Sequence, residues 1–196
     1  MDNVAARPEN AVEMRNITKT FGTVVANDRI CLTLKTGEIL ALLGENGSGK
    51  TTLMNVLSGI YLQDSGEILV CSKPVTIRSP KDSYALGIGM IHQHFKLVDV
   101  LSAAENIVLG LKGGRTLNRR DINRQVAEIA AQYGFEIDPA KKVYTMSVSE
   151  KQTVEIIKAL YRGAEILILD EPTAVLTPQE TTKLFAVLRM MKAHGK

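Results

Sequence analysis

The chain has 196 residues, of which 45% are apolar and 23% charged, and its net charge is +3. This length and composition suit a globular domain with a sizeable core and exclude disordered and fibrous classes. The small, dispersed net charge argues against nucleic acid as a partner. No apolar run is long enough to cross a bilayer and residues 1–14 lack the apolar centre of a secretion signal, so a cytoplasmic protein with at most peripheral membrane association is expected.

The N-terminal part is predicted to be a β-layer. Residues 1–11 are expected to form a flexible N-terminus. Short apolar and β-branched runs in residues 12–36 and 66–78, punctuated by glycines, predict antiparallel strands. Cys31 and Cys71 have no spacing typical of a metal site or a disulfide framework. Both cysteines are therefore predicted to be small buried residues.

Residues 38–43, which contain the apolar run ILALL, are predicted to form a buried strand. A glycine-rich loop follows them and leads into a predicted helix at 50–57. The loop, GENGSGKTT, fits G-x-x-x-x-G-K-[ST] without mismatch, and such loops cradle phosphate with backbone N–H groups. Lys50 is expected to reach the β- and γ-phosphates and Thr51 to coordinate Mg²⁺. The alternative is a purely structural turn before a lysine. The predicted nucleotide-binding residues are Gly44, Glu45, Asn46, Gly47, Ser48, Gly49, Lys50, Thr51 and Thr52.

The middle of the chain is predicted to be mainly helical. Ser79, followed by proline, predicts a helix start before a strand at Ile88–Ile91. Residues 102–162 are then expected to be mostly helix, with a capping box at Ser102 and a helix end at Gly134.

Two carboxylates end a second buried strand. Ile166–Leu169 is an apolar run that stops at Asp170 and Glu171, and a last helix is predicted from Thr177. Asp170 is the expected Mg²⁺ ligand, and Glu171 is the candidate for polarising the attacking water. An Asp-Glu pair after an apolar strand is common by itself. Together with the phosphate loop it predicts a P-loop nucleotide hydrolase.

The chain resembles the nucleotide-binding domain of an ABC transporter ATPase. The stretches DEPTAVLTPQE and MIHQHFKLVDVLSAAENIVLG resemble the first half of the tandem ATP-binding subunits that serve importers of nucleosides and simple sugars. The resemblance covers residues 12–196. It implies an α/β P-loop fold with an antiparallel β-subdomain, a parallel-sheet core and a helical subdomain at about 100–162.

The same resemblance implies a set of cofactors and partners. The cofactors are ATP and Mg²⁺. The partners are a second nucleotide-binding domain, transmembrane permease subunits and, indirectly, a periplasmic or lipoprotein solute-binding protein. The implied location is the cytoplasmic face of the cell membrane.

The resemblance also assigns roles to residues outside the phosphate loop. Phe21 is implied to stack on adenine, although a phenylalanine is more often a core residue. Gln93 is implied to reach Mg²⁺ and the attacking water, which makes Gln93, Lys50 and Glu171 the catalytic set and Thr51, Gln93 and Asp170 the metal ligands. The signature that would face the γ-phosphate of a partner domain aligns on Met146 and on Ser147, Val148, Ser149 and Glu150.

Three departures from the family pattern stand out. Ser149 replaces the second glycine of the signature, and its spacing to Gln152 also permits a capping box. Thr177 replaces an aspartate that many relatives carry. The sequence ends at Lys196, before the strand expected to carry a switch histidine, and His194 is not assigned that role; a fragment or truncated form of a longer two-domain subunit is expected.

Two other functions remain to be weighed. The altered signature and the absent histidine strand permit a nucleotide-binding module with little or no turnover. A soluble ABC protein acting on DNA or ribosomes is disfavoured, because the short interval between Gln93 and Ser147 leaves no room for a long coiled-coil arm. The transported solute is not encoded in residues that contact ATP.

Overall fold

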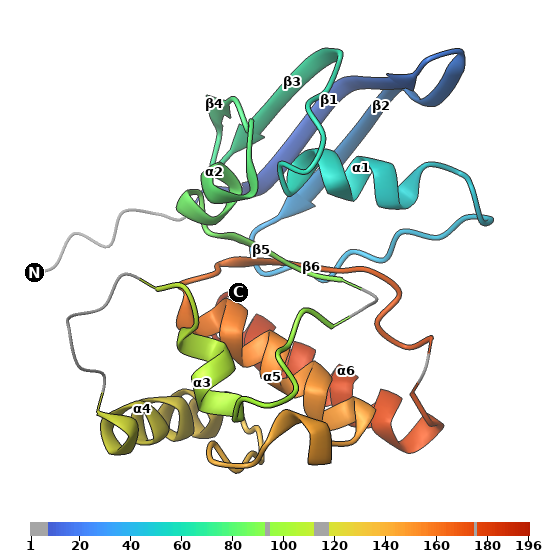
Figure 1. The fold of residues 1–196 in the computed structure, drawn as a ribbon. Helices are drawn as coiled ribbons and strands as arrows, with labels where there is room; N and C mark the ends of the chain where they lie inside the picture. Colours follow the sequence, from blue (N-terminus) through green and yellow to red (C-terminus); the bar gives the residue numbers. More distant parts are fainter. Residues whose placement is uncertain (1–7, 93–94, 112–117, 175) are drawn as a thin grey trace, which may run out of the picture. The chain divides into compact units, whose positions relative to one another are not determined.

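The structure, a computed structural model, describes residues 8–92, 95–111, 118–174 and 176–196 (Figure 1). It divides into two compact units. The first contains the residues up to Ile88 together with Gly195 and Lys196, and the second contains Gly89–His194. No helix in the described ranges combines the length and the apolar character needed to span a bilayer.

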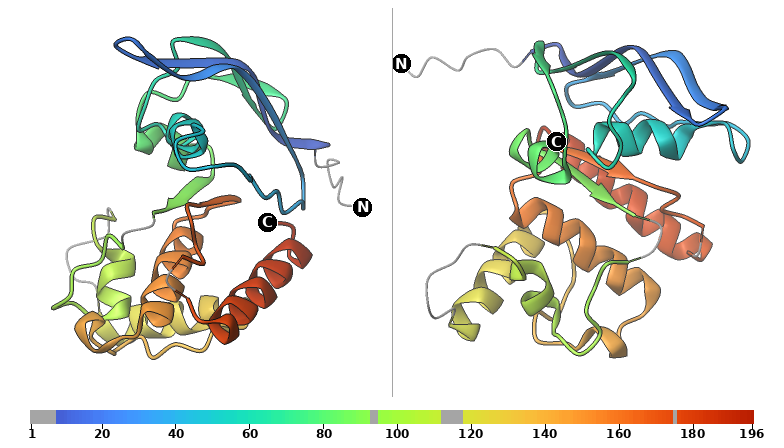
Figure 2. Two further views of the ribbon diagram at one scale, coloured as in Figure 1. Left: turned by 90° about the vertical axis from the view of Figure 1, so that its right-hand side faces the viewer. Right: turned by 45° about the horizontal axis from the view of Figure 1, so that its top comes forward.

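The first unit is built on a four-stranded antiparallel sheet, as predicted, with the strand order β2-β1-β3-β4. Its strands are β1 (Asn10–Phe21), β2 (Val24–Lys35), β3 (Ser65–Val70) and β4 (Lys73–Val75). Its helices are α1 (Lys50–Leu57) and α2 (Pro80–Ala85). Figures 1 and 2 show both helices on the same side of this sheet. Apolar side chains of the sheet and of α1 form the core, among them Val12, Met14, Ile17, Val56 and Ile68.

The predicted buried strand at residues 38–43 is wrong. These residues have no regular secondary structure and are exposed, Leu43 by 92%. Within the described part of the first unit no strand pairs with them. An apolar run predicts that a segment is suited to burial, but a strand forms only where a neighbouring strand supplies hydrogen-bond partners.

The two cysteines are also not buried, contrary to the prediction. Cys31 lies on β2, an edge strand, where its Sγ accepts a hydrogen bond from the Asn16 N–H at 3.2 Å. Cys71 occupies the turn between β3 and β4, with a φ of 50°. Cys31 is exposed because it lies on an edge strand and Cys71 because it lies in a turn. A cysteine residue by itself indicates neither position.

The second unit is predominantly helical, as predicted. It contains a two-stranded sheet of β5 (Ile88–Ile91) and β6 (Ile166–Leu169). The first residue of β5, Ile88, still belongs to the first unit. Its helices are α3 (Ala103–Val108), α4 (Arg119–Gln132), the short 3₁₀ helix η1 (Val143–Thr145), α5 (Val148–Tyr161) and α6 (Pro178–Ala193). Apolar faces of α3, α4, α5 and α6 share one core, which includes Ile107, Val126, Val154, Ile157 and Leu184.

Helix caps follow the predictions with one exception. Ser79, Ser102 and Thr177 cap α2, α3 and α6 as the sequence indicated. The proposed box between Ser149 and Gln152 is wrong, because α5 begins earlier and is capped by Ser147. The serine that caps is the one whose backbone is still extended, with φ −65° and ψ 166°, as an N-cap requires.

Candidate functional site

The glycine-rich loop of the first unit surrounds the amine of Lys50 with oxygen atoms. Lys50 Nζ donates hydrogen bonds to the Gly44 carbonyl at 2.8 Å, to the Glu45 carbonyl at 2.7 Å and to Ser48 Oγ at 3.3 Å. Because the loop immediately precedes α1, the N–H groups of the first turn of that helix are also directed toward it. The loop therefore places an ammonium group and a helix N-terminus together, as an anionic ligand requires.

Gly49 lies against the sheet. It has a left-handed φ of 85° and is the N-cap of α1. A Cβ added there would lie 2.3 Å from the Ala26 carbonyl oxygen and 2.7 Å from Asn27 Nδ2. The buried Asn27 amide donates to the Gly49 carbonyl at 3.2 Å. Only glycine fits between the sheet and the helix start at this point.

Phe21 ends β1 as an exposed ring. Its side chain is 43% exposed and contacts Tyr61 edge to face, with ring centroids 5.1 Å apart. Lys19 Nζ lies 5.4 Å from the centre of the Phe21 ring and pairs with Asp64 at 2.7 Å. Asp64 Oδ2 also accepts hydrogen bonds from the N–H and the hydroxyl of Thr20. The core alternative for Phe21 is wrong in this structure, and the ring is available for stacking.

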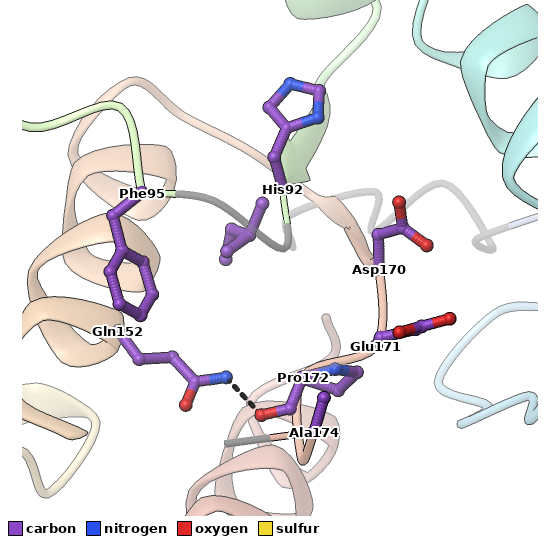
Figure 3. A pocket seen from close by; sticks show the side chains of 8 residues that line it. His92, Phe95, Gln152, Asp170, Glu171, Pro172 and Ala174 are labelled. Atoms are coloured by element: carbon purple, nitrogen blue, oxygen red, sulfur yellow. Dashed lines mark hydrogen bonds between the residues drawn. The ribbon is translucent and has the colours of Figure 1, made fainter. Parts of the chain in front are cut away.

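In the second unit, Asp170 and Glu171 follow β6 directly. The Asp170 N–H donates to the Ile91 carbonyl at 3.1 Å, which continues the pairing of β6 with β5 by one residue. Glu171 adopts a left-handed φ of 47°, a conformation that costs a non-glycine residue about 1–2 kcal/mol. Figure 3 shows both carboxylates directed to the same side, away from Gln152.

A small pocket lies behind this turn, with a cavity volume of about 20 Å³. That volume holds about one water molecule and is far below the several hundred Å³ of a nucleotide site. Its lining residues are Ile91, His92, Phe95, Gln152, Asp170, Glu171, Pro172 and Ala174 (Figure 3). Partial burial lowers the pKa of His92 and nearby Lys96 acts in the same direction, while Asp170 and Glu155 oppose the shift.

The signature segment forms the start of α5. Ser147 Oγ accepts from the Glu150 N–H at 3.2 Å, and Glu150 Oε2 accepts from the Ser147 N–H at 2.8 Å. Lys141 pairs with the other oxygen of Glu150, and this pairing, followed by the bond to the Ser147 backbone, lowers the pKa of the Glu150 carboxyl. In the first turn of α5, Val148 is exposed and Ser149 is partly buried. The substituted signature is thus a well-capped helix start with a partly exposed first turn.

The predicted site residues fall into two groups. Phe21 and the loop from Gly44 to Thr52 belong to the first unit, and Asp170, Glu171 and the signature belong to the second. Gln93 lies outside the described residues. Of the expected metal ligands, Thr51 offers a hydroxyl and Asp170 a carboxylate, and both are the hard oxygen donors that Mg²⁺ prefers.

Two further residues of the site were not found by sequence reasoning. Asn27 supports the phosphate loop from β2, and Gln152 Nε2 donates to the Pro172 carbonyl at 2.9 Å, next to Glu171. Both are polar side chains and both are buried. A buried polar side chain requires a partner, but a charged residue adjoins each position, so the local sequence did not indicate that either side chain is buried.

Comparison with known proteins agrees with this arrangement. The model of the family described as ABC transporter matches residues 27–174. The guanosine import ATP-binding protein NupO of Bacillus subtilis (strain 168) is 51% identical over 191 residues, which cover 96% of this chain and 37% of that protein. The ribose import ATP-binding protein RbsA of Caldanaerobacter subterraneus subsp. tengcongensis is 46% identical over 191 residues, covering 96% of this chain and 38% of that protein.

The fold has a close counterpart among solved structures. The structure of cbiO1 from Clostridium perfringens, part of the ABC transporter complex cbiONQ, is similar with a TM-score of 0.81 and 28% identity, over 95% of this chain and 75% of that one. This likeness confirms the predicted α/β fold class. The chain spans 37–38% of the length of the two import proteins. The family match begins at Asn27, which supports the phosphate loop, and ends just beyond Glu171. The chain therefore belongs to the ABC transporter family.

Proposed function

We propose that this chain binds ATP and hydrolyses it to power the import of a nucleoside or a simple sugar, as part of a longer ATP-binding subunit. The observation that carries the proposal is the ring of oxygen atoms around Lys50 Nζ, at 2.7–3.3 Å, in front of the N-terminus of α1. A lysine held in this way exchanges carbonyl oxygens for phosphate oxygens at little cost when nucleotide enters.

The roles of the other residues follow from their chemistry. Phe21 offers its exposed ring to adenine. Thr51, Asp170 and Gln93 would hold Mg²⁺, which neutralises charge that develops on the phosphates. Glu171 accepts the proton of the attacking water, since its carboxylate is held at the end of β6 with its side chain directed away from the α5 side of the turn (Figure 3).

The proposed partners follow from the exposed start of α5. The N–H groups in the first turn of that helix and the Ser147 hydroxyl form a surface suited to the γ-phosphate of nucleotide bound to a second such domain. Permease subunits would supply the path through the membrane, with a solute-binding protein acting on them, and the chain would lie at the cytoplasmic face of the membrane. The names of the relatives NupO and RbsA support a nucleoside or ribose-like solute.

The test is a Glu171→Gln variant of the full-length subunit, measured for nucleotide affinity and for phosphate release. We expect affinity for Mg-ATP to stay within about twofold and phosphate release to fall by about 10²-fold or more, because the general base is lost. Glu136→Gln, which changes an exposed glutamate in the same unit, is the matched control and should leave both unchanged.

The outcomes separate the two functions considered. Parental hydrolysis by the Glu171→Gln variant would remove the role assigned to Glu171. If the parent protein binds Mg-ATP but releases no phosphate, the chain is instead a nucleotide-binding module without turnover. If it does not bind Mg-ATP at all, the proposal fails.

A further inference from the structure

We infer that Gln152 is a positioning residue that holds the turn carrying Glu171, and that it therefore sets the rate of hydrolysis without contributing to nucleotide affinity. The inference rests on the proposed function, because it assigns a role within the hydrolytic step. It ties the second turn of α5 to the end of β6 inside the second unit.

Gln152 makes a buried, directed contact with this turn. Its side chain is 5% exposed, and its Nε2 donates to the Pro172 carbonyl at 2.9 Å (Figure 3). Gln152 is the first buried residue of α5, and Val154, Ile156 and Ile157 follow it in the buried part of the helix, so its amide lies at the edge of an apolar core. Burying an amide is unfavourable unless it is hydrogen-bonded, which indicates that the bond to Pro172 is the reason for the residue type.

The turn requires such a contact. Glu171 has a left-handed φ of 47° and precedes a proline, whose ring further restricts the conformation of the residue before it. Pro172 has no N–H group, so its carbonyl is the only backbone hydrogen-bonding group that it offers. A donor on that carbonyl holds the peptide between Pro172 and Thr173, one residue beyond Glu171, and so limits the movement of the turn that carries the Glu171 side chain.

The helix that supplies the donor is itself held firmly. Its start is closed by the reciprocal bonds between Ser147 and Glu150, and Glu155, one turn after Gln152, accepts from the Lys96 N–H at 3.0 Å. Gln152 thus projects from a fixed support. Displacing a catalytic group by about 1 Å can cost about 10²-fold in rate, so the loss of this support should be visible in turnover.

The first test replaces Gln152 by Met in the full-length subunit, which keeps the length of the side chain and removes the donor. We expect kcat for ATP hydrolysis to fall by about 10- to 100-fold, while KM and the affinity for Mg-ATP stay within about twofold. Gln132→Met, at the exposed last position of α4, is the matched control and should leave kcat unchanged.

The second test uses Gln152→Glu, because a carboxylate cannot donate to a carbonyl whereas a protonated carboxyl can. We expect the ratio of its kcat to that of the parent to be lowest near pH 8 and to rise as the pH falls toward 5.5. The corresponding ratio for Gln152→Met should not change with pH. A residue that only fills space would give no such difference between the two variants.

A third measurement does not depend on activity. Hydrogen exchange of the amides from Asp170 to Ala174 should be faster in Gln152→Met than in the parent, with the phosphate loop unaffected. Parental kcat in Gln152→Met would overturn the inference; if that variant does not fold, a pH-independent ratio in Gln152→Glu would overturn it. If the parent shows no hydrolysis, the proposed function fails. The role of Gln152 is then judged by hydrogen exchange alone, and unchanged exchange from Asp170 to Ala174 in either folded variant would overturn it.

Discussion

The phosphate loop of the first unit and the carboxylate turn of the second are held in place by different means. The loop is fixed mainly through backbone atoms: Lys50 and the Asn27 amide donate to loop carbonyls, and Gly49 fits against the Ala26 carbonyl. The turn and the start of α5 are fixed by side chains, namely those of Gln152, Ser147 and Glu150. Backbone geometry allows few residue types, whereas a side-chain contact can be made by several. The difference explains why the loop matches its pattern fully while the signature tolerates Val148 and Ser149.

The largest effect is expected from Gly49→Ala. Its Cβ would meet the Ala26 carbonyl at 2.3 Å while its backbone remains in a left-handed conformation, which itself costs about 1–2 kcal/mol. We expect a clear fall in thermal stability and loss of measurable Mg-ATP binding, because the loop must move away from the sheet. Calorimetry and nucleotide titration measure the two effects.

Gly22→Ala is the control for this prediction. Gly22 also has a left-handed φ, of 60°, but a Cβ there meets nothing within 4 Å. It should show the conformational cost alone and should bind nucleotide like the parent. If Gly49→Ala is no worse than Gly22→Ala in either measurement, the close backbone contact does not fix the loop.

A smaller effect is expected at the start of α5. Ser147→Ala removes the side chain that caps the helix and should lower the free energy of unfolding by about 1 kcal/mol. Ser149→Ala should have little effect, since the Ser149 side chain does not cap the helix and alanine is the better helix former. Denaturant unfolding of the two variants distinguishes them. Equal losses, or a larger loss at Ser149, would contradict the observed cap.

These regions also show what could be predicted from the sequence. The helix at 50–57 and the caps at Ser79, Ser102 and Thr177 were predicted correctly because each depends on residues within a few positions of one another. The strand at 38–43 was not, since strand formation depends on a distant partner. The partners of Asn27 and Gln152 lie 22 and 20 residues away, so their bonds are equally invisible locally.

The smallest predicted effect concerns Asp64, which supports the end of β1 next to Phe21. Its hydrogen bonds from Lys19 and from Thr20 lower the pKa of Asp64 to about 2, from an ordinary value of 3.8. Because the folded-state pKa is the lower one, the ionised carboxylate stabilises the fold above about pH 4. This contribution is lost as the pH falls from about 4 toward 2.

Asp64→Asn tests this directly, because it keeps an acceptor for Thr20 and removes the charge that pairs with Lys19. We expect its Tm to lie slightly below that of the parent at pH 7 and the difference to close as the pH falls toward 2. Asp28→Asn removes an equal charge from an exposed position of the same unit and serves as the control. A Tm difference for Asp64→Asn that persists at pH 2 would show that Asp64 stabilises the end of β1 through its packing and hydrogen bonds and not through its charge. The support beside Phe21 would then resemble the phosphate loop, which is fixed by geometry, more than the turn at Glu171.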